Sequence, residues 1–472
     1  MSDFRLFWRL SQGSIFGKKF LPSSPDKQIP VEVFPMSTEE EINKRNDNVA
    51  KSSSRLGITY LPTDTFMQII DILREEIEGN EKYGREKLDE LILQLSGVSR
   101  FFRAIATENV LLWIKITNSY ILRNGFKERI ARTKNAPLSL ELMIHEGTGW
   151  EQILSIILPY RDRWRTLYAE VFSRSRQIAK MFPGLEFPGV ETAALTFDCE
   201  ENCSPFFAQW KFPDLKTLKI YNTIPPPGTF GHIVSLEIWG LHVEEELTNA
   251  YLKRIPRFLV HLRRLERLVL DLSNLFATPM APDMFPDIVL ASVKSFTLRN
   301  SDRENIDWMI SAYPIGRLLK CMKLPNVKEL NLSLCFVKHE SIVHWAMMFS
   351  DCPETLSLVT SLSLTIPTPE IHFTLALFLS QFRKVEILEV DVEAFVDTIS
   401  LPMFQVSLGR LRKFILREPK DLPIDWKQNL NKLTPNADRL DVVVERTSNR
   451  HSSVDADAEE WRQHALSMFE GN

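Results

Sequence analysis

The sequence predicts an α/β solenoid, in which short parallel strands with helical connections stack one after another, preceded by a small all-α domain. Two observations predict this fold. Short phrases with alternating apolar residues recur from Trp164 to Val442, and alternation of this kind is typical of half-buried strands. Three segments with apolar residues at helical spacing come before them, between residues 61 and 113. The two patterns divide the chain into a helical part and a strand-rich part.

Residues 1–56 are predicted to be a disordered N-terminal tail. The stretch from Leu21 to Arg55 is rich in Pro, Ser, Lys and Glu, a composition that buries too little apolar surface to fold by itself. A mitochondrial presequence is the weaker alternative, because the basic and aromatic cluster from Phe4 to Leu10 is short for such a segment.

A helical domain is predicted at residues 57–117. Asp64 to Ile77 carries apolar residues at helical spacing, and Thr63 is suited to capping its first turn. Two more apolar stripes follow, in residues 88–95 and 98–106. Three short helices cannot hide all of this surface from one another, so we expect part of it to be a docking surface.

The helical stretch resembles the F-box motif, which couples a protein to the Skp adaptor of an SCF (Skp, cullin, F-box) ubiquitin ligase. The resemblance is carried by LPTDTFMQIIDIL from Leu61 and LILQLSGVSRFFRAIATENVLLW from Leu91. This chain departs from the motif at Ser99 and Phe102, where Cys and Trp are more usual, and in a charged insert at residues 74–87. The alternative is an ordinary three-helix cap on a larger domain.

The resemblance implies which residues contact the adaptor or form the small core of the helical domain. These residues are Leu61, Pro62, Phe66, Ile69, Ile70, Leu73, Leu91, Leu95, Val98, Arg100, Phe102 and Trp113.

Residues 118–160 are predicted to form a helical and strand linker that leads into the repeats. A basic, helical run at Ile121 to Lys134 is followed by Pro137-Leu138-Ser139-Leu140. A similar basic helix and Pro-Leu-Ser-Leu strand follow the F-box in the F-box families that are expanded in mushroom-forming fungi. This resemblance implies that a repeat array comes next.

Residues 161–446 contain a recurring phrase with the spacing LxxLxL, which is typical of leucine-rich repeats. Its eleven instances start at Trp164, Val190, Leu215, Ile233, Leu265, Val293, Val327, Val359, Val385, Leu411 and Ala437. The last three steps between starts are each 26 residues, which lies within the range of this repeat class, about 20 to 29 residues. Longer steps indicate inserted loops or helices. The alternative, a doubly wound sheet with one ligand crevice, is disfavoured by the number of short phrases.

Within each phrase, alternate side chains are expected to face the core, as Leu218 and Ile220 do, while the residues between them face outward. The outward residues define the surface expected to meet a partner: Thr217, Lys219, Tyr221, Glu237, Trp239, Arg267, Asp271, Arg299, Glu329, Asn331, Glu389, Asp391, Lys413 and Arg417. Charges of both signs are interspersed there, which fits a protein partner better than a phosphate backbone. For any single position, an ordinary solvated strand residue is the alternative.

The connections and the C-terminus complete the predicted layout. Pro256 and Pro314 are expected to kink or end two connecting helices, because proline lacks the helical N–H. Residues 447–472 are predicted to be a polar tail, in which Glu459 to Phe469 forms a helix that caps the array or folds on a partner.

Composition narrows the classes of partner. The formal net charge of −4 provides no basic footprint for nucleic acid, and no apolar run is long enough to span a bilayer. Five cysteines in a long chain do not indicate a disulfide framework, so the expected compartment is the cytoplasm, the nucleus or both.

The sequence contains no familiar catalytic motif: no GxxxxGK, GxGxxG, HExxH or GxSxG. Cys335, His339, His344 and Cys352 are residue types that bind zinc, but their spacing does not match a familiar zinc finger. We therefore predict no catalytic residue, no metal and no cofactor.

Together these interpretations predict the substrate-receptor subunit of an SCF-type E3 ubiquitin ligase, not an enzyme. As the resemblance implies, the F-box would bind the Skp adaptor, and through it a cullin, while the repeat array binds an unknown protein substrate. The alternative is a leucine-rich-repeat interaction scaffold not engaged with a ubiquitin ligase. A hydrolase or transferase with an unfamiliar site is a third, less favoured hypothesis.

Overall fold

The computed structural model describes residues 62–78, 91–92, 94–121, 126–144, 150–171, 184–197, 207, 209–240, 245–272, 285–300, 308–334, 357–365, 379, 381–391, 410–417 and 440–445. Their helices and strands all belong to one compact unit, Thr63–Asn472. Both predicted tails lie outside the described residues, as do Leu61 and the group from Cys335 to Cys352.

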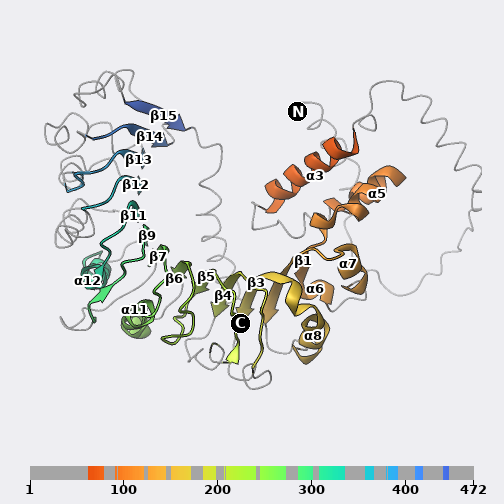
Figure 1. Cartoon of the computed structure of the whole chain (residues 1–472), viewed down its shortest axis with the longest axis horizontal. Helices are drawn as coiled ribbons and strands as arrows, with labels where there is room; N and C mark the ends of the chain where they lie inside the picture. The colour runs from red at the N-terminus through yellow and green to blue at the C-terminus, as the bar shows by residue number, and fades with distance from the viewer. Residues whose placement is uncertain are drawn as a thin grey trace, which may run out of the picture. The chain divides into compact units, whose positions relative to one another are not determined.

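The described strands form one large parallel sheet and one small one (Figure 1). The large sheet has thirteen strands in chain order; each inner strand pairs with the strands on both sides of it, and the edge strands β1 and β15 each pair with one. Its members are β1 (Lys115–Thr117), β2 (Leu138–Ile144), β3 (Trp164–Val171), β4 (Thr192–Phe197), β5 (Thr217–Tyr221), β6 (Ser235–Trp239), β7 (Arg267–Asp271), β9 (Ser295–Asn300), β11 (Glu329–Leu334), β12 (Ser361–Thr365), β13 (Ile387–Asp391), β14 (Lys413–Arg417) and β15 (Asp441–Glu445). β8 (Ile288–Val289) and β10 (Met322–Lys323) form the two-stranded sheet.

The predicted α/β architecture with parallel strands and helical connections is confirmed at this level, and the sheet does not close into a barrel. Every one of the eleven LxxLxL phrases overlaps a strand, from β3 to β15. The Pro-Leu-Ser-Leu run coincides with β2. β1 lies inside the range predicted to be helical, and its three residues are too few to show an alternating pattern.

In-register pairing explains why the phrases build a continuous core. Leu218 on β5 lies opposite Leu236 on β6, which in turn lies opposite Leu268 on β7. The same row continues through Phe296, Leu330, Leu362, Leu388 and Phe414, and all of these side chains are buried. Because the same position of each phrase lies beside its counterpart on the next strand, each strand covers apolar surface that its neighbour could not bury alone.

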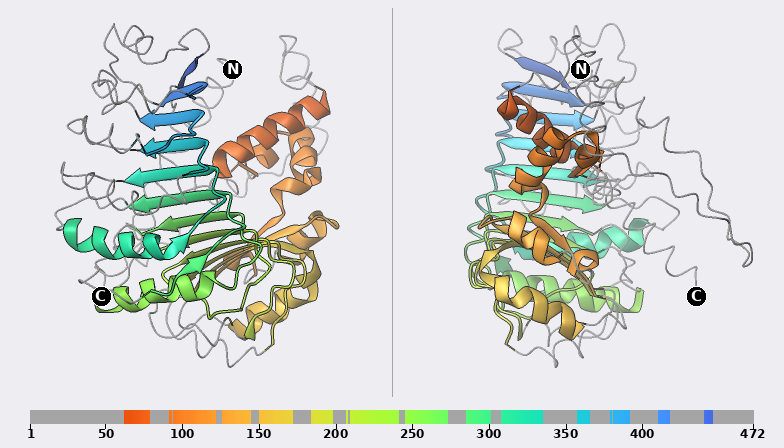
Figure 2. Two further views of the ribbon diagram at one scale, coloured as in Figure 1. Left: turned by 60° about the vertical axis from the view of Figure 1, so that its left-hand side comes forward. Right: turned by 90° about the vertical axis from the view of Figure 1, so that its right-hand side faces the viewer.

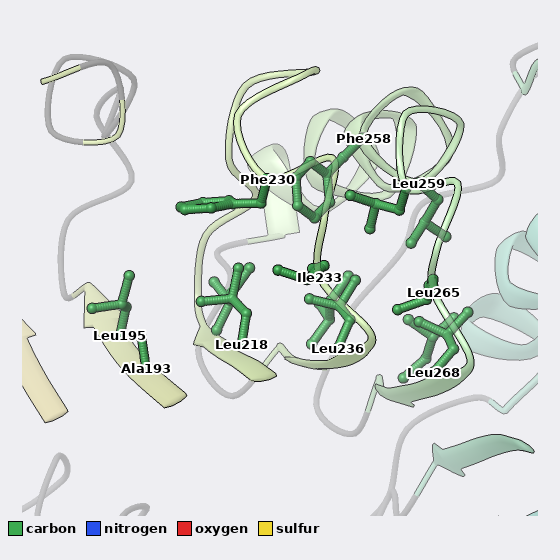
Figure 3. Close-up of a cluster of buried hydrophobic side chains, with 14 of the residues drawn as sticks. Ala193, Leu195, Leu218, Phe230, Ile233, Leu236, Phe258, Leu259, Leu265 and Leu268 are labelled. Atoms are coloured by element: carbon green, nitrogen blue, oxygen red, sulfur yellow. The ribbon is translucent and has the colours of Figure 1, made fainter. Parts of the chain in front are cut away.

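The connections between strands supply the other side of this core (Figure 3). Figure 3 shows Leu218, Leu236 and Leu268 side by side on their strands, with Phe230 and Phe258 above them. Phe258 belongs to α11 (Glu245–Leu259), the helix between β6 and β7, while α12 (Trp308–Cys321) precedes β10. Figure 2 shows the strands as a stack of arrows that point the same way.

Pro256 and Pro314 do not end their helices, contrary to one of the two outcomes expected for them. α11 continues past Pro256 to Leu259, and α12 continues past Pro314 to Cys321. Leu252, Ile255, Phe258 and Leu259 of α11 are fully buried. Their packing stabilises the last turn, which compensates for the hydrogen bond that proline cannot donate.

Helices also form in the part of the chain before the large sheet. α3 (Thr63–Glu78) is followed by helical residues 91–92 and 94–98, and then by α5 (Arg100–Glu108) and the 3-10 helix η2 (Val110–Leu112). Ser99 caps α5, because its side-chain oxygen accepts a hydrogen bond from the Phe102 amide at 3.2 Å. The short helices α6 (Asn118–Ile121), α7 (Phe126–Arg132), α8 (Trp150–Ile157) and η3 (Leu158–Arg163) connect β1, β2 and β3.

In the part of the chain that the structure describes, every helix is too short or too polar to cross a membrane.

Replacing Leu236 with Ala tests the row of stacked leucines. We expect the free energy of unfolding to fall by about 2 to 5 kcal/mol, because a fully buried leucine leaves a cavity when truncated. Val234, two residues earlier, is exposed, so Val234→Ala is the matched control and should cost less than about 1 kcal/mol. Urea unfolding followed by circular dichroism measures both. Equal losses would contradict the assigned register.

Candidate functional site

The sheet face opposite the core carries the residues that alternation placed outward, and we call it the polar face. In-register pairing brings residues from successive repeats side by side there. Lys219 lies opposite Glu237, and Tyr221 lies opposite Trp239. Trp239 lies opposite Asp271, and Asp271 lies opposite Arg299. Strands β5, β6, β7 and β9 thus assemble one cluster of charged and aromatic side chains.

Two cations share one carboxylate in the middle of this cluster. The Lys219 Nζ lies 3.3 Å from Glu237 Oε2, and the Arg267 Nη2 lies 3.7 Å from Glu237 Oε1. Glu237 is buried while both cations reach solvent. Burying a carboxylate is costly unless its charge is paired. Lys219 and Arg267 supply that pairing for Glu237.

An aromatic ring forms the second half of the cluster. The Tyr221 and Trp239 rings are stacked, with centroids 5.6 Å apart and planes 27° apart. The Arg299 guanidinium lies over the Trp239 ring, 5.0 Å from its centroid, and its Nη1 is 4.0 Å from Asp271 Oδ2. Stacking on both sides fixes the indole ring, and the ring in turn orients the guanidinium.

The structure modifies the expectation that these outward residues are solvated. Glu237, Trp239 and Asp271 all point away from the core, yet each is buried. Glu237 is paired with Lys219 and Arg267, Trp239 is stacked against Tyr221 and lies under Arg299, and Asp271 is paired with Arg299. Burial of a tryptophan and two carboxylates on a sheet face outside the core distinguishes this cluster from an ordinary solvated surface.

The remaining residues predicted for this surface lie further along the sheet. Glu329 is exposed, and the Asn331 side-chain amide donates a hydrogen bond to Thr297 Oγ1 at 3.2 Å. Arg417 on β14 forms an ion pair with Glu389 on β13. Thr217 is half-buried beside the cluster, and Lys413 is half-buried opposite Ile387. Asp391 lies opposite Arg417 in the strand register.

Sequence reasoning missed a second group of polar residues on the same face, in β1, β2 and β3. The Tyr168 hydroxyl donates a hydrogen bond to Glu170 Oε1 at 2.8 Å, and Glu170 is buried. Glu141, also buried, lies 3.9 Å from the Lys115 Nζ. Burial raises the pKa of Tyr168 well above its usual value, and the negative charge of Glu170 raises it further. Alternation within the phrase from Trp164 was the signal that could have found Tyr168 and Glu170.

The residues that the resemblance selected in the helical part fall into two sets. Phe66, Ile70, Leu91, Phe102 and Trp113 are buried. The Phe66 and Phe102 rings meet edge to face with centroids 4.7 Å apart, so this set forms the local core.

The other set reaches the surface to different degrees. Pro62, Val98 and Arg100 are exposed, whereas Ile69, Leu73 and Leu95 are half-buried. Leu61 lies outside the described residues.

Trp113 connects these helices with the first strand. Its indole Nε1 donates a hydrogen bond to the Ala106 carbonyl at 2.8 Å. The Arg132 guanidinium of α7 lies over its ring, 4.3 Å from the centroid. The Arg129 guanidinium lies 5.4 Å from the same centroid, and its Nε donates to the Lys115 carbonyl at 3.2 Å. Trp113 therefore has a packing role at the junction.

Exposed apolar side chains remain around this local core. Ile72 on α3, Val98 before α5, Phe101 on α5 and Leu111 on η2 are all exposed large hydrophobic residues. Of these, only Val98 was predicted as a contact. Helical periodicity identified which stripe is apolar, but it could not show which members of the stripe the neighbouring helices leave uncovered.

Metal ligands do not gather in the described residues, where no three His, Cys, Asp or Glu side chains come together as a metal site would require.

Comparison with known proteins adds no relative, since no protein-family model and no curated protein sequence matches this chain.

The buried tyrosine makes a prediction about alkaline stability. Because the folded-state pKa of Tyr168 is raised, its contribution to stability is complete below the unfolded-state pKa, about 10, and falls as the pH rises above it. Tyr168→Phe should therefore lose less stability than the wild type between about pH 9 and about pH 11. The urea midpoint at each pH measures this.

Tyr251 on α11 also has a raised pKa, from burial and the charge of Asp271, but it is present in both proteins and cancels in the comparison. Equal alkaline losses in wild type and Tyr168→Phe would contradict the burial of the Tyr168 hydroxyl.

Proposed function

We propose that the chain is the substrate-receptor subunit of an SCF-type E3 ubiquitin ligase, with no catalytic group of its own. In this proposal the helices before the sheet form an F-box that binds the Skp adaptor and through it a cullin, and the strand array binds a protein substrate on its polar face. The observation that carries the proposal is that one compact unit contains both a set of exposed apolar helical residues and an ordered polar sheet face.

The strand topology supports a leucine-rich-repeat solenoid as the substrate-binding part. Thirteen parallel strands follow one another in chain order, and the LxxLxL phrases from β3 to β14 pair at matching positions. A stack of this kind contacts only nearest neighbours and displays one face of every strand. Such arrays hold a partner on an extended surface rather than in a closed pocket.

The helical part supports an F-box through its residual apolar surface. Its own core is complete around Phe66 and Phe102, so the exposed Ile72, Val98, Phe101 and Leu111 are not needed to stabilise the fold. Large apolar side chains that a complete local core leaves exposed are candidates for an interaction site. The resemblance of the helical stretch to the F-box motif and its exposed apolar residues thus favour the same adaptor-binding role.

The mechanism in this proposal is proximity. A rigid array positions a substrate lysine close to an activated ubiquitin carried by partner subunits, which raises the local concentration of the reacting groups. The chain needs only to bind two partners at once. A leucine-rich-repeat scaffold outside any ubiquitin ligase would use the same polar face without engaging an adaptor.

Coexpression with a Skp adaptor tests the proposal. We expect a one-to-one complex by size-exclusion chromatography with light scattering, and Ile72→Asp with Val98→Asp should weaken it at least about tenfold, since each puts a charge in an apolar contact. These exposed positions are preferable to Phe66, whose replacement would disrupt the local core.

Val260→Asp, at an equally exposed valine after α11, is the matched control and should leave the complex intact. Absence of a wild-type complex would favour the scaffold alternative, and a complex insensitive to the Ile72 and Val98 changes would refute the assigned contact surface.

A further inference from the structure

The ion pairs on the polar face share one arrangement, in which the cation reaches solvent while its carboxylate is largely buried. The Arg267 side chain is 56% exposed and the Lys219 side chain 41%, whereas their common partner Glu237 is 9% exposed. Arg299 is 27% exposed against 7% for Asp271. The same order holds for Lys115 with Glu141 and for Arg417 with Glu389. A partner that approaches this face therefore meets positive charge first.

This arrangement is not a general property of the chain's ion pairs. The pairs Lys216 with Glu191 and Lys294 with Glu266, at the start of their strands, have both members well exposed. Solvated pairs of that kind contribute little to stability or recognition. On the polar face, the buried carboxylates instead hold the cations at fixed positions above the sheet.

Arg299 is the residue best prepared to bind an anion. Its guanidinium lies over the Trp239 ring, 5.0 Å from the centroid, and the nearest carboxylate oxygen, on Asp271, is 4.0 Å away, beyond hydrogen-bond distance. Within the described part of the chain, the guanidinium has this ion pair and this ring contact but no hydrogen bond. A planar guanidinium with unfilled donors matches a carboxylate, which it can bind through two parallel hydrogen bonds.

Trp239 adds a second unfilled donor next to Arg299. Its Nε1 is buried and has no hydrogen-bond partner among the described residues. Tyr221 covers one face of the same ring, so the indole cannot turn away without losing the stacking contact. A buried donor without a partner is costly, so a partner whose acceptor reaches Nε1 as the surrounding side chains shift would relieve that cost.

We propose that the polar face of β5, β6, β7 and β9 binds an acidic segment of a protein partner, with one carboxylate on Arg299 and others near Lys219 and Arg267. If the proposed ligase function holds, this segment belongs to the substrate, so the identification of the segment as substrate rests on that function. A nucleic acid is a poorer fit, because the three cations lie above two carboxylates, Glu237 and Asp271, and a phosphate backbone favours uncompensated positive charge.

Selection from a random dodecapeptide library displayed on phage, against the full-length chain, tests this proposal. We expect peptides enriched in Asp and Glu. A synthetic, fluorescein-labelled copy of the best one should bind more weakly as ionic strength rises. Arg299→Gln should weaken its binding at least about tenfold, because charge-assisted hydrogen bonds are lost. Arg299→Lys should recover only part of the affinity, since lysine keeps the charge but not the planar fork.

Arg412→Gln is the matched control, because it removes the same charge from an exposed ion pair with Glu386 that lies outside the cluster. It should change the affinity less than about twofold, as exposed pairs do. Circular dichroism of each variant establishes that the fold is retained.

Several results would overturn the proposal: no enriched peptide, enrichment of neutral or basic peptides, or acidic peptides whose affinity is unchanged in Arg299→Gln. The proposal would also be excluded if a twenty-nucleotide single-stranded RNA bound more tightly than the selected peptide. It would be excluded likewise if the peptide bound only after its serines were phosphorylated. Adaptor coexpression is a separate measurement on the helical part, so failure of the ligase function and failure of acidic-segment binding give different results.

Discussion

The structure depends on the register of its parallel strands. The amide of Lys216 donates to the Glu191 carbonyl, that of Lys294 to the Glu266 carbonyl, and that of Lys328 to the Lys294 carbonyl, so the same position of successive repeats is joined each time. Because side chains alternate with a period of two, this register places one apolar row in the core and the polar rows on the other face. A shift by one residue would exchange the two faces, and core and polar face would be lost together.

The same register converts distant sequence positions into a compact cluster. Tyr221, Trp239 and Arg299 come from three different strands, yet their side chains form one stack because β5, β6, β7 and β9 are adjacent. The apolar row supplies the stability, and the exposed ion pairs at the strand starts add little. Since the fold does not depend on the polar face for its stability, the buried carboxylates there can position cations for contact with a partner.

Much of the fold could be predicted from sequence, since the LxxLxL phrases report the period of a strand directly and all eleven overlap one. β1 could not, because three residues carry no period. Alternation also found Trp239 and Arg299 as outward residues. It could not show that Trp239 is buried between Tyr221 and Arg299, since that depends on contacts between residues far apart in the chain. In the helices, periodicity placed the buried Phe66 and Ile70 on the apolar stripe and left out the exposed Ile72, but it could not separate the buried Phe102 from the exposed Val98 on the later stripe.

Hydrogen exchange measured by mass spectrometry tests the register most directly. We expect the amides of β6, β7 and β9 to exchange slowly and at a common rate, because their in-register ladders open only together. The turn around Gly228, which lies outside the ladder, should exchange much faster. Rapid exchange in β6, β7 and β9, at the rate of that turn, would contradict the stacked parallel sheet and with it the polar face.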